Sequence, residues 1–471
     1  MVFNSIEFLL FFPIVYFLYV LLKRKSQNLL LLLASYFFYG YWDYRFLSLL
    51  LISTLVDYFV SIQIENSDSV KKRKFFLGIS IFSNLSILGF FKYYNFFIQS
   101  AIDSFSNFGI QIHPFTMQII LPLGISFYTF QTLSYTIDVY RKDLKAERNF
   151  LDFALFVTFF PQLVAGPIER ATNLLPQVKL DRIITSEKLE QGALLILIGL
   201  FKKVYIADNL ALIVNPIFKL DHLSSLTNAE CLVGATAFIF QIYGDFSGYS
   251  DIARGLSKLL GFELMQNFRH PIFSESMNDF WRRWHISFMN WLRDYVYKSL
   301  GKKDDSEYKI HFNNMIVFLI SGLWHGANWT FVVWGLYCGL ITSLYRIYIQ
   351  IMKIDPKTHM PPKWRRFVNF LFTFSLMILS VVFFRSENLS YAFSFLGKMF
   401  TQFGGIDKNI LAMFLKISAV LLVLEFHQYK TGTEFAIFRF NTFTRSLIYI
   451  LLFYSVVIMG NFNNGFIYFV F

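Results

Sequence analysis

The chain has 471 residues, of which 55% are hydrophobic, 20% aromatic and only 16% charged, and its mean hydropathy is +0.47. Soluble domains carry about 25% charged residues, so this composition excludes a water-soluble globule and indicates a polytopic membrane protein. The two cysteines, Cys231 and Cys338, provide neither a disulfide framework nor a metal cluster.

The net charge of +12 lies in short basic runs between apolar segments, which indicates membrane topology and not a nucleic-acid partner. These runs are Lys23–Lys25, Lys71–Lys74, Arg141–Arg148, Lys202–Lys203 and Lys363–Arg366. Under the positive-inside rule we expect them in cytoplasmic loops. The apolar stretch 5–22 precedes its basic cluster, the reverse of a cleavable signal peptide, so it predicts a retained first span with its N-terminus outside.

Apolar segments recur along the whole chain and predict ten to thirteen membrane helices in one integral-membrane domain, residues 1–471. The segments are 5–22, 29–39, 46–64, 75–97, 116–137, 151–166, 190–217, 229–246, 312–349, 367–384, 389–400, 411–427 and 446–459. Segment 312–349 is too long for one span. We find no internal repeat and no flexible linker.

Residues 241–255, "QIYGDFSGYSDIARG", place Asp245 and Asp251 beside an apolar segment. Two carboxylates suggest acid–base catalysis, but Asp251 and Arg254 have the i, i+3 spacing of a helical ion pair. Small residues between them are typical of close helix packing in membranes. The pattern favours a neutralised scaffold that lines a pocket.

Residues 278–300 predict one amphipathic helix with an aromatic face. That face consists of Trp281, Trp284, His285, Phe288, Trp291, Leu292 and Tyr295. Such a helix lies along the interface or lines a protein interior. His285 is a candidate active-site residue because burial would keep its imidazole neutral. The alternative is an interfacial helix whose Arg282 and Arg283 only anchor lipid headgroups.

A second candidate, His325, lies in "SGLWHGANW" between apolar flanks. If the segment is helical, His325 lies about 16 Å from Asn314, roughly half the hydrocarbon thickness. An ionisable side chain at that depth is costly and usually marks function. Gly322 and Gly326 permit close backbone approach or a broken helix. The alternative is a neutral core histidine bonded to a neighbouring helix. His427 is a weaker third candidate.

Several stretches together resemble the membrane-bound O-acyltransferases. "SGLWHGANW" is similar to the histidine motif of that family, and "DFWRRWHISFMNWLRDYVY" to the segment that bears its second histidine. Further matching stretches are "LPLGISFYTFQTLSYTIDVYR" (121–141), "FFPQLVAGPIER" (159–170), "YGDFSGYSDIARG" (243–255) and the terminal "GFIYFVF" (465–471). The bacterial branch that acetylates alginate or peptidoglycan, or transfers D-alanine to teichoic acids, is the most similar.

The resemblance implies an all-α fold, with a ring of membrane helices around a central funnel or tunnel. It implies that His325 is the catalytic histidine and His285 its partner. We expect the pocket around them to be lined by Trp324, Asn328, Trp281, Trp284, Asp245, Tyr249 and Asp251.

The resemblance further implies acetyl transfer from a cytoplasmic thioester, acetyl-CoA or an acyl carrier, to an envelope polysaccharide outside. We expect no bound cofactor or metal, no nucleic acid, an extracytoplasmic acetyltransferase partner, and a multi-pass location in the bacterial inner membrane. Transfer of D-alanyl or longer acyl groups is the alternative within the family. A small-solute transporter with a histidine proton relay, or a non-catalytic scaffold, are alternatives outside it.

Overall fold

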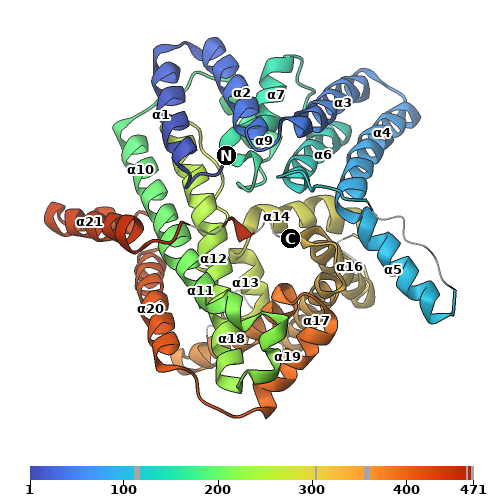
Figure 1. The fold of residues 1–471 in the computed structure, drawn as a ribbon. Helices are drawn as coiled ribbons and strands as arrows, with labels where there is room; N and C mark the ends of the chain where they lie inside the picture. Colours follow the sequence, from blue (N-terminus) through green and yellow to red (C-terminus); the bar gives the residue numbers. More distant parts are fainter. Residues whose placement is uncertain (111–116, 303–304, 355–360, 463–464, 468–471) are drawn as a thin grey trace. The chain divides into compact units, whose positions relative to one another are not determined.

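A computed structural model describes residues 1–471 except 111–116, 303–304, 355–360, 463–464 and 468–471 (Figure 1). The described part is helical and contains no strand, which confirms the predicted all-α class. It forms two compact units, Met1–Ala193 with Ala253–Met265, and Leu194–Ile252 with Gln266–Phe471. Helices α10 (Ser186–Leu200) and α12 (Asn228–Leu259) contribute to both. One integral domain over 1–471 stays a prediction.

The first unit is built around α3, α4 and α6, which lie side by side (Figure 1). Its helices are α1 (Ile6–Leu21), α2 (Arg24–Gly40), α3 (Leu47–Asn66), α4 (Val70–Leu88), α5 (Tyr94–Asn107), α6 (Ile125–Arg141), α7 (Phe150–Thr158), α8 (Phe160–Leu163) and α9 (Ala171–Lys179), with the short segments Tyr44–Phe46 and Gly89–Tyr93.

A buried polar network joins these three helices. The Asp57 carboxylate on α3 accepts hydrogen bonds from Asn84 Nδ2 at 2.8 Å, from Thr136 Oγ1 at 3.1 Å and from the Ser80 hydroxyl. Ser53 Oγ donates to Asn84 Oδ1 at 2.7 Å. Polar groups inside a membrane bundle need partners of this kind, so the network fixes how α3, α4 and α6 pack.

The second unit holds both candidate histidines. Its helices are α11 (Asp208–Ile217), α13 (Met277–Arg283), α14 (Ile286–Trp291), α15 (Lys298–Leu300), α16 (Glu307–His325), α17 (Trp329–Ile351), α18 (Lys363–Arg385), α19 (Leu389–Thr401), α20 (Lys408–Thr431) and α21 (Thr442–Met459), with the short segments Phe201–Ala207, Leu220–Ser225, Pro271–Phe273, Leu292–Tyr297 and Ala436–Arg439.

Helices α16 and α17 pack closely against each other because glycines remove side chains from their contact (Figure 1). A Cβ built on Gly322 would lie 2.2 Å from the Phe331 carbonyl oxygen, and one built on Gly335 would lie 2.4 Å from that of Phe318. The apolar segment 312–349, predicted to be too long for one span, is thus divided between two helices.

Six helical segments of the described part are long and apolar enough to cross a membrane. They are Tyr44–Asn66, Val70–Asn107, Trp329–Ile351, Lys363–Arg385, Lys408–Thr431 and Thr442–Met459. This multi-pass, all-helical character matches the sequence prediction. The count of ten to thirteen spans and their arrangement around a funnel stay predictions.

Segment 151–166 does not form one spanning helix, contrary to its apolar composition. It folds as α7 and α8, separated at Phe159. The nine residues of α7 reach about 13 Å, less than half the hydrocarbon thickness. Phe153 to Val157 are fully buried, so their apolarity serves the protein core.

Candidate active site

The predicted single helix over 278–300 is broken at His285. Helix α13 ends at Arg283, and α14 begins at Ile286. Trp284 is extended, and His285 adopts left-handed backbone angles with φ 44° and ψ 51°. That region is uncommon for residues other than glycine, although histidine is among those enriched there. The single helical face that the spacing predicted over 278–300 is therefore interrupted at His285, and that part of the prediction is wrong.

Asn267 holds the break in place. Its side-chain oxygen accepts hydrogen bonds from Ser287 N at 3.1 Å and Ser287 Oγ at 2.9 Å, and its backbone oxygen accepts from Ile286 N at 2.9 Å. Its amide nitrogen donates to Ser250 Oγ at 3.3 Å. Asn267 is only 1% exposed, so these bonds form in an environment that makes unpaired donors costly.

The second histidine also lies at a helix end, which is one of the two alternatives that the flanking glycines left open. Helix α16 ends at His325, and Gly326 continues in extended conformation with φ −166°. Asn328 Oδ1 then accepts from Thr330 N at 3.0 Å and caps α17, while its Nδ2 donates to the Glu387 carbonyl at 2.8 Å. Asn328 therefore has a structural role as the cap that restarts the helix.

The two imidazoles belong to one buried aromatic cluster. We define the aromatic cluster as Phe246, Phe288, Trp324, Trp334 and Phe384. Phe288 lies 4.9 Å from His285 and 5.8 Å from His325 between ring centroids. Trp324 lies 5.6 Å from His285 and 4.9 Å from His325. Two aromatic rings thus contact both histidines.

Each histidine also contacts aromatic rings that the other histidine is not described as contacting. Phe246 lies edge-on to His285 at 4.6 Å. Trp334 and Phe384 lie 5.1 and 5.0 Å from His325. His285 is 1% and His325 5% exposed, so both rings are shielded from solvent.

Burial decides the protonation of His285, which lies outside the six spanning segments. Removal of the ring from water lowers the pKa of His285 well below its ordinary value. The imidazole is therefore neutral at physiological pH, and one nitrogen can accept a proton while the other donates a hydrogen bond.

Trp281 and Trp284 flank the cluster on different sides. Trp281 contacts Trp334 at 5.9 Å and Phe318 at 5.2 Å, so it supports the His325 side. Trp284 contacts Phe268 at 5.0 Å, and Phe268 contacts Phe246 at 5.1 Å. Both tryptophans precede the break and contact the same ring, Phe280, at 4.9 and 5.4 Å.

Asp245 and Tyr249 contact the described part of the C-terminal segment, residues 465–467. Asp245 Oδ2 accepts from Ile467 N at 2.7 Å, and its Oδ1 pairs with Lys203 Nζ at 2.6 Å. Phe466 then packs against Tyr249 at 4.8 Å and against Phe246 at 5.9 Å. These contacts link the chain end, over its described residues, to a wall of the His285 site.

Asp251 belongs to a separate buried ion network. Lys202 Nζ lies 3.1 Å from the Asp251 carboxylate and 3.0 Å from that of Glu425. Glu425 also contacts His270 Nδ1 at 2.6 Å. The structure thus gives Asp251 a lysine partner on the segment Phe201–Ala207, and its pairing with Arg254 stays a prediction.

The basic pair Lys202–Lys203 is not a cytoplasmic loop, and that part of the topology reading is wrong. Both lysines are 5% exposed within the π-helical segment Phe201–Ala207, which joins α10 to α11. Lys203 Nζ pairs with Asp208 at 2.7 Å as well as with Asp245. The charges of this pair neutralise buried carboxylates and give no information on membrane orientation.

Comparison with known sequences decides the family. A sequence profile of MBOAT, the membrane-bound O-acyltransferase family, matches residues 141–386. The chain is 42% identical over 406 residues to a "Probable alginate O-acetylase AlgI" of Azotobacter vinelandii, covering 85% of this chain and 78% of that protein. The chain belongs to the membrane-bound O-acyltransferase family.

Two further relatives show the breadth of similarity to this acyltransferase. The present chain is 36% identical over 435 residues to a "Peptidoglycan O-acetyltransferase" of Helicobacter pylori, covering 85% of this chain and 80% of that protein. It is 27% identical over 291 residues to a "Teichoic acid D-alanyltransferase" of Streptococcus thermophilus, covering 57% and 69% respectively. The protein is thus an acyltransferase enzyme with multi-pass membrane character.

Sequence reasoning missed several residues that shape the acyltransferase site. Phe384 packs on His325 from 59 positions further along the chain, and Asn267 sets the His285 break from an irregular stretch before α13. The sequence around Phe384 and around Asn267 contains no motif that marks either residue, because each acts only through a contact in the folded structure. Lys202 and Lys203 did have a signal, because both lysines lie inside the apolar segment 190–217 and carboxylates follow downstream.

Among the described residues, no group of three or more histidine, cysteine, aspartate or glutamate side chains is arranged to hold a metal ion.

Proposed function

We propose that this acyltransferase moves an acetyl group from a thioester donor to a hydroxyl of an envelope polysaccharide, with His325 as general base. The observation that carries the proposal is the pair of buried imidazoles that share Phe288 and Trp324, each at a helix break. The names of the alginate and peptidoglycan relatives supply the class of acceptor.

The reaction needs one base and one electrophile. A thioester is already activated, so the enzyme has to position the acceptor hydroxyl and remove its proton. In the proposed step, His325 takes that proton as the oxygen attacks the acyl carbon. The carbon–sulfur bond then breaks, and the leaving thiolate receives the proton. General-base catalysis of this kind contributes about 10²–10⁴-fold to the rate.

His285 assists in one of two ways. Its neutral ring donates a hydrogen bond to the acyl carbonyl as negative charge develops there, or it orients His325 through the shared aromatic cluster. Its 1% exposure and lowered pKa support a role that requires the uncharged form.

The aromatic cluster supports the same chemistry by excluding water. Phe246, Trp334 and Phe384 shield the two rings, and a water-poor site limits hydrolysis of the thioester. In this proposal Trp324, Trp281 and Trp284 line or back the acyl site. Asn328, Asp245, Tyr249 and Asp251 shape it through the helix cap, the C-terminal anchor and the ion network.

The donor is acetyl-CoA or an acyl-carrier thioester on the cytoplasmic side, and the acceptor lies outside. An extracytoplasmic acetyltransferase completes the modification. The protein resides in the bacterial inner membrane with its N-terminus outside. The largely exposed basic run Lys71–Lys74 at the start of α4 supports the cytoplasmic placement of that helix end.

The experiment is replacement of His325 by alanine in the producing cell, followed by measurement of ester-linked acetyl in the envelope polymer. We expect the variant to remain in the membrane and the polymer to lose its acetyl groups. His427→Ala is the matched control, because His427 also lies in an apolar helix and stacks on an aromatic ring, Phe440, at 4.9 Å. Normal acetyl content with His325→Ala would refute the proposal.

Mass spectrometry of the same polymer separates the alternative within the family. Acetyl adds a different mass from D-alanyl or longer acyl groups, and a pocket discriminates against one extra methylene by only about 1–3 kcal/mol. A D-alanyl adduct would move the assignment to the teichoic-acid branch without affecting the role of His325.

A further inference from the structure

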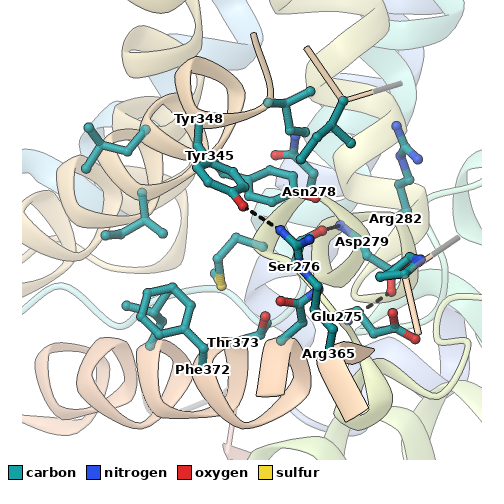
Figure 2. Close-up of a pocket in the computed structure, with 18 of the residues that line it drawn as sticks. Glu275, Ser276, Asn278, Asp279, Arg282, Tyr345, Tyr348, Arg365, Phe372 and Thr373 are labelled. Atoms are coloured by element: carbon teal, nitrogen blue, oxygen red, sulfur yellow. Dashed lines mark hydrogen bonds between the residues drawn. The ribbon is translucent and has the colours of Figure 1, made fainter. Parts of the chain in front are cut away.

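A pocket of about 740 Å³ opens in the second unit between α13, the last turns of α17 and the first half of α18 (Figure 2). This size falls within the range of small-ligand sites. One end is polar and is lined by Asp279, Arg282, Arg283 and Arg365; the other is lined by span residues such as Leu344 and Phe372. The pocket is therefore amphipathic, and the role proposed for His285 and His325 does not use it.

The carboxylates at the polar end are already neutralised. Glu275 Oε1 lies 2.7 Å from Arg366 NH2, and Asp279 Oδ1 lies 2.8 Å from Arg283 Nε. These two ion pairs leave the guanidinium groups of Arg282 and Arg365 to set the local charge. The end of the pocket is thus positive and suited to an anion.

Arg365 is held for such a contact. Its NH2 donates to the Tyr348 hydroxyl at 3.0 Å, and Figure 2 shows this bond across the pocket wall. Within the residues that the structure describes, neither Arg282 nor Arg365 forms an ion pair with a carboxylate. A guanidinium with a neutral hydroxyl partner keeps its remaining N–H groups available for phosphate oxygens.

The apolar end follows the membrane span. Phe372 and Leu376 lie seven and eleven residues after Arg365 on α18, which places them about 10 and 16 Å further along the helix axis. Leu344 on α17 is 49% and Phe372 66% exposed. Because both helices are spanning segments, these faces are open to acyl chains and not to water.

From this arrangement we infer that the pocket binds an anionic glycerophospholipid. The phosphate lies at the polar end that Arg282 and Arg365 line, and one acyl chain lies along Leu344, Phe372 and Leu376. Basic pockets between membrane helices on the cytoplasmic side are suited to anionic headgroups, and the basic run Lys363–Arg366 favours that side. A soluble phosphate compound would use the arginines but leave the apolar wall uncovered.

The test is native mass spectrometry of the purified full-length protein in detergent, titrated with dioleoyl phosphatidylglycerol or dioleoyl phosphatidylcholine. We expect tighter binding of phosphatidylglycerol, by about tenfold, because two charge-assisted contacts recognise its net negative charge. The double variant R282Q/R365Q should lose this preference. Phe372→Ala should weaken both lipids several-fold and keep the preference.

Arg445→Gln is the matched control, because Arg445 also lies in the first turn of a spanning helix, α21, outside the pocket. It should bind both lipids like the wild type. Thermal unfolding without added lipid checks that every variant is folded.

Two outcomes would overturn the inference. One is equal affinity of the folded R282Q/R365Q variant and the wild type for phosphatidylglycerol. The other is displacement of bound lipid by micromolar coenzyme A or inorganic phosphate, which would assign the arginines to a soluble phosphate compound. Neither readout depends on acyl transfer, so this test stands apart from that of the proposed function.

Discussion

The two candidate histidines lie at helix ends that are built differently. The end at His325 is made by its immediate neighbours: Gly326 is extended, Gly322 admits the partner helix, and Asn328 caps α17. The end at His285 is fixed by Asn267, which lies 18 residues earlier in the chain. There the histidine itself adopts left-handed backbone angles. The position of His325 therefore depends on its neighbours in the sequence, whereas the position of His285 depends on a tertiary contact.

This difference explains which break is visible in the sequence. Glycines and an asparagine cap around His325 are standard signals of a helix end. The aromatic spacing of 278–300 favours an unbroken helix, and nothing adjacent to His285 contradicts it. The left-handed conformation of His285 costs free energy, and the hydrogen bonds that Asn267 accepts from Ile286 and Ser287 compensate this cost.

The largest stability effect should come from the locally encoded end. In Gly322→Ala the new Cβ would lie 2.2 Å from the Phe331 carbonyl oxygen, a backbone atom that moves only with the whole α16–α17 pair. We expect a loss of about 3 kcal/mol or more in the free energy of unfolding, measured by SDS titration in mixed micelles.

Gly397→Ala serves as its control. No heavy atom lies within 4 Å of a Cβ built there, and Gly397 is inside helix α19. The substitution should stabilise the protein by up to about 1 kcal/mol. Equal effects of the two substitutions would contradict the close contact at Gly322.

The tertiary break should respond to Asn267→Ala by about 2 kcal/mol. The variant leaves the buried Ser287 N–H and hydroxyl without their acceptor. The double variant N267A/S287A should recover part of this loss, because one of the orphaned donors is removed. Strict additivity of the two single changes would argue that Asn267 does not hold the break.

The stability of variants at His285 should follow how well the new residue tolerates a positive φ. His285→Asn should be more stable than His285→Val by about 1–2 kcal/mol, because asparagine accepts left-handed angles and a β-branched residue does not. Both should lose acyl transfer. If valine is tolerated equally well, the left-handed backbone at 285 is not a constraint on the fold.

Wild type and His285→Gln should also differ in how their stability depends on pH. Burial lowers the pKa of His285 in the folded state, so the unfolded chain binds more protons once the pH falls below about 6.5. Wild type should then lose up to about 1.4 kcal/mol of stability per pH unit more than the variant. Parallel unfolding curves between pH 7.5 and 5 would show that this ring is not desolvated.

The sequence predicted more of the fold than of the site. The all-helical membrane class and the division of 312–349 follow from apolar run length, and the glycines left a helix end at His325 as one of two alternatives. Segment 151–166 did not span, because hydropathy cannot distinguish residues buried in protein from residues facing lipid. The same ambiguity made the buried pair Lys202–Lys203 look like a loop.

Within the site, residue types were predictable but contacts were not. His285, His325 and Trp324 do meet, through Phe288. Phe384 and Asn267 join from distant positions that carry no local pattern. The role of Asp245 as an anchor for Ile467 required knowing that Ile467 lies against α12.

The most direct test is the single-turnover rate at which purified protein in nanodiscs transfers acetyl from its thioester donor to the polysaccharide acceptor. His325→Ala should lower this rate by about 10²–10⁴-fold, His427→Ala should leave it within about twofold of wild type, and added imidazole should partly restore the His325→Ala rate. A folded His325→Ala protein that transfers acetyl at the wild-type rate would contradict the central role of this imidazole.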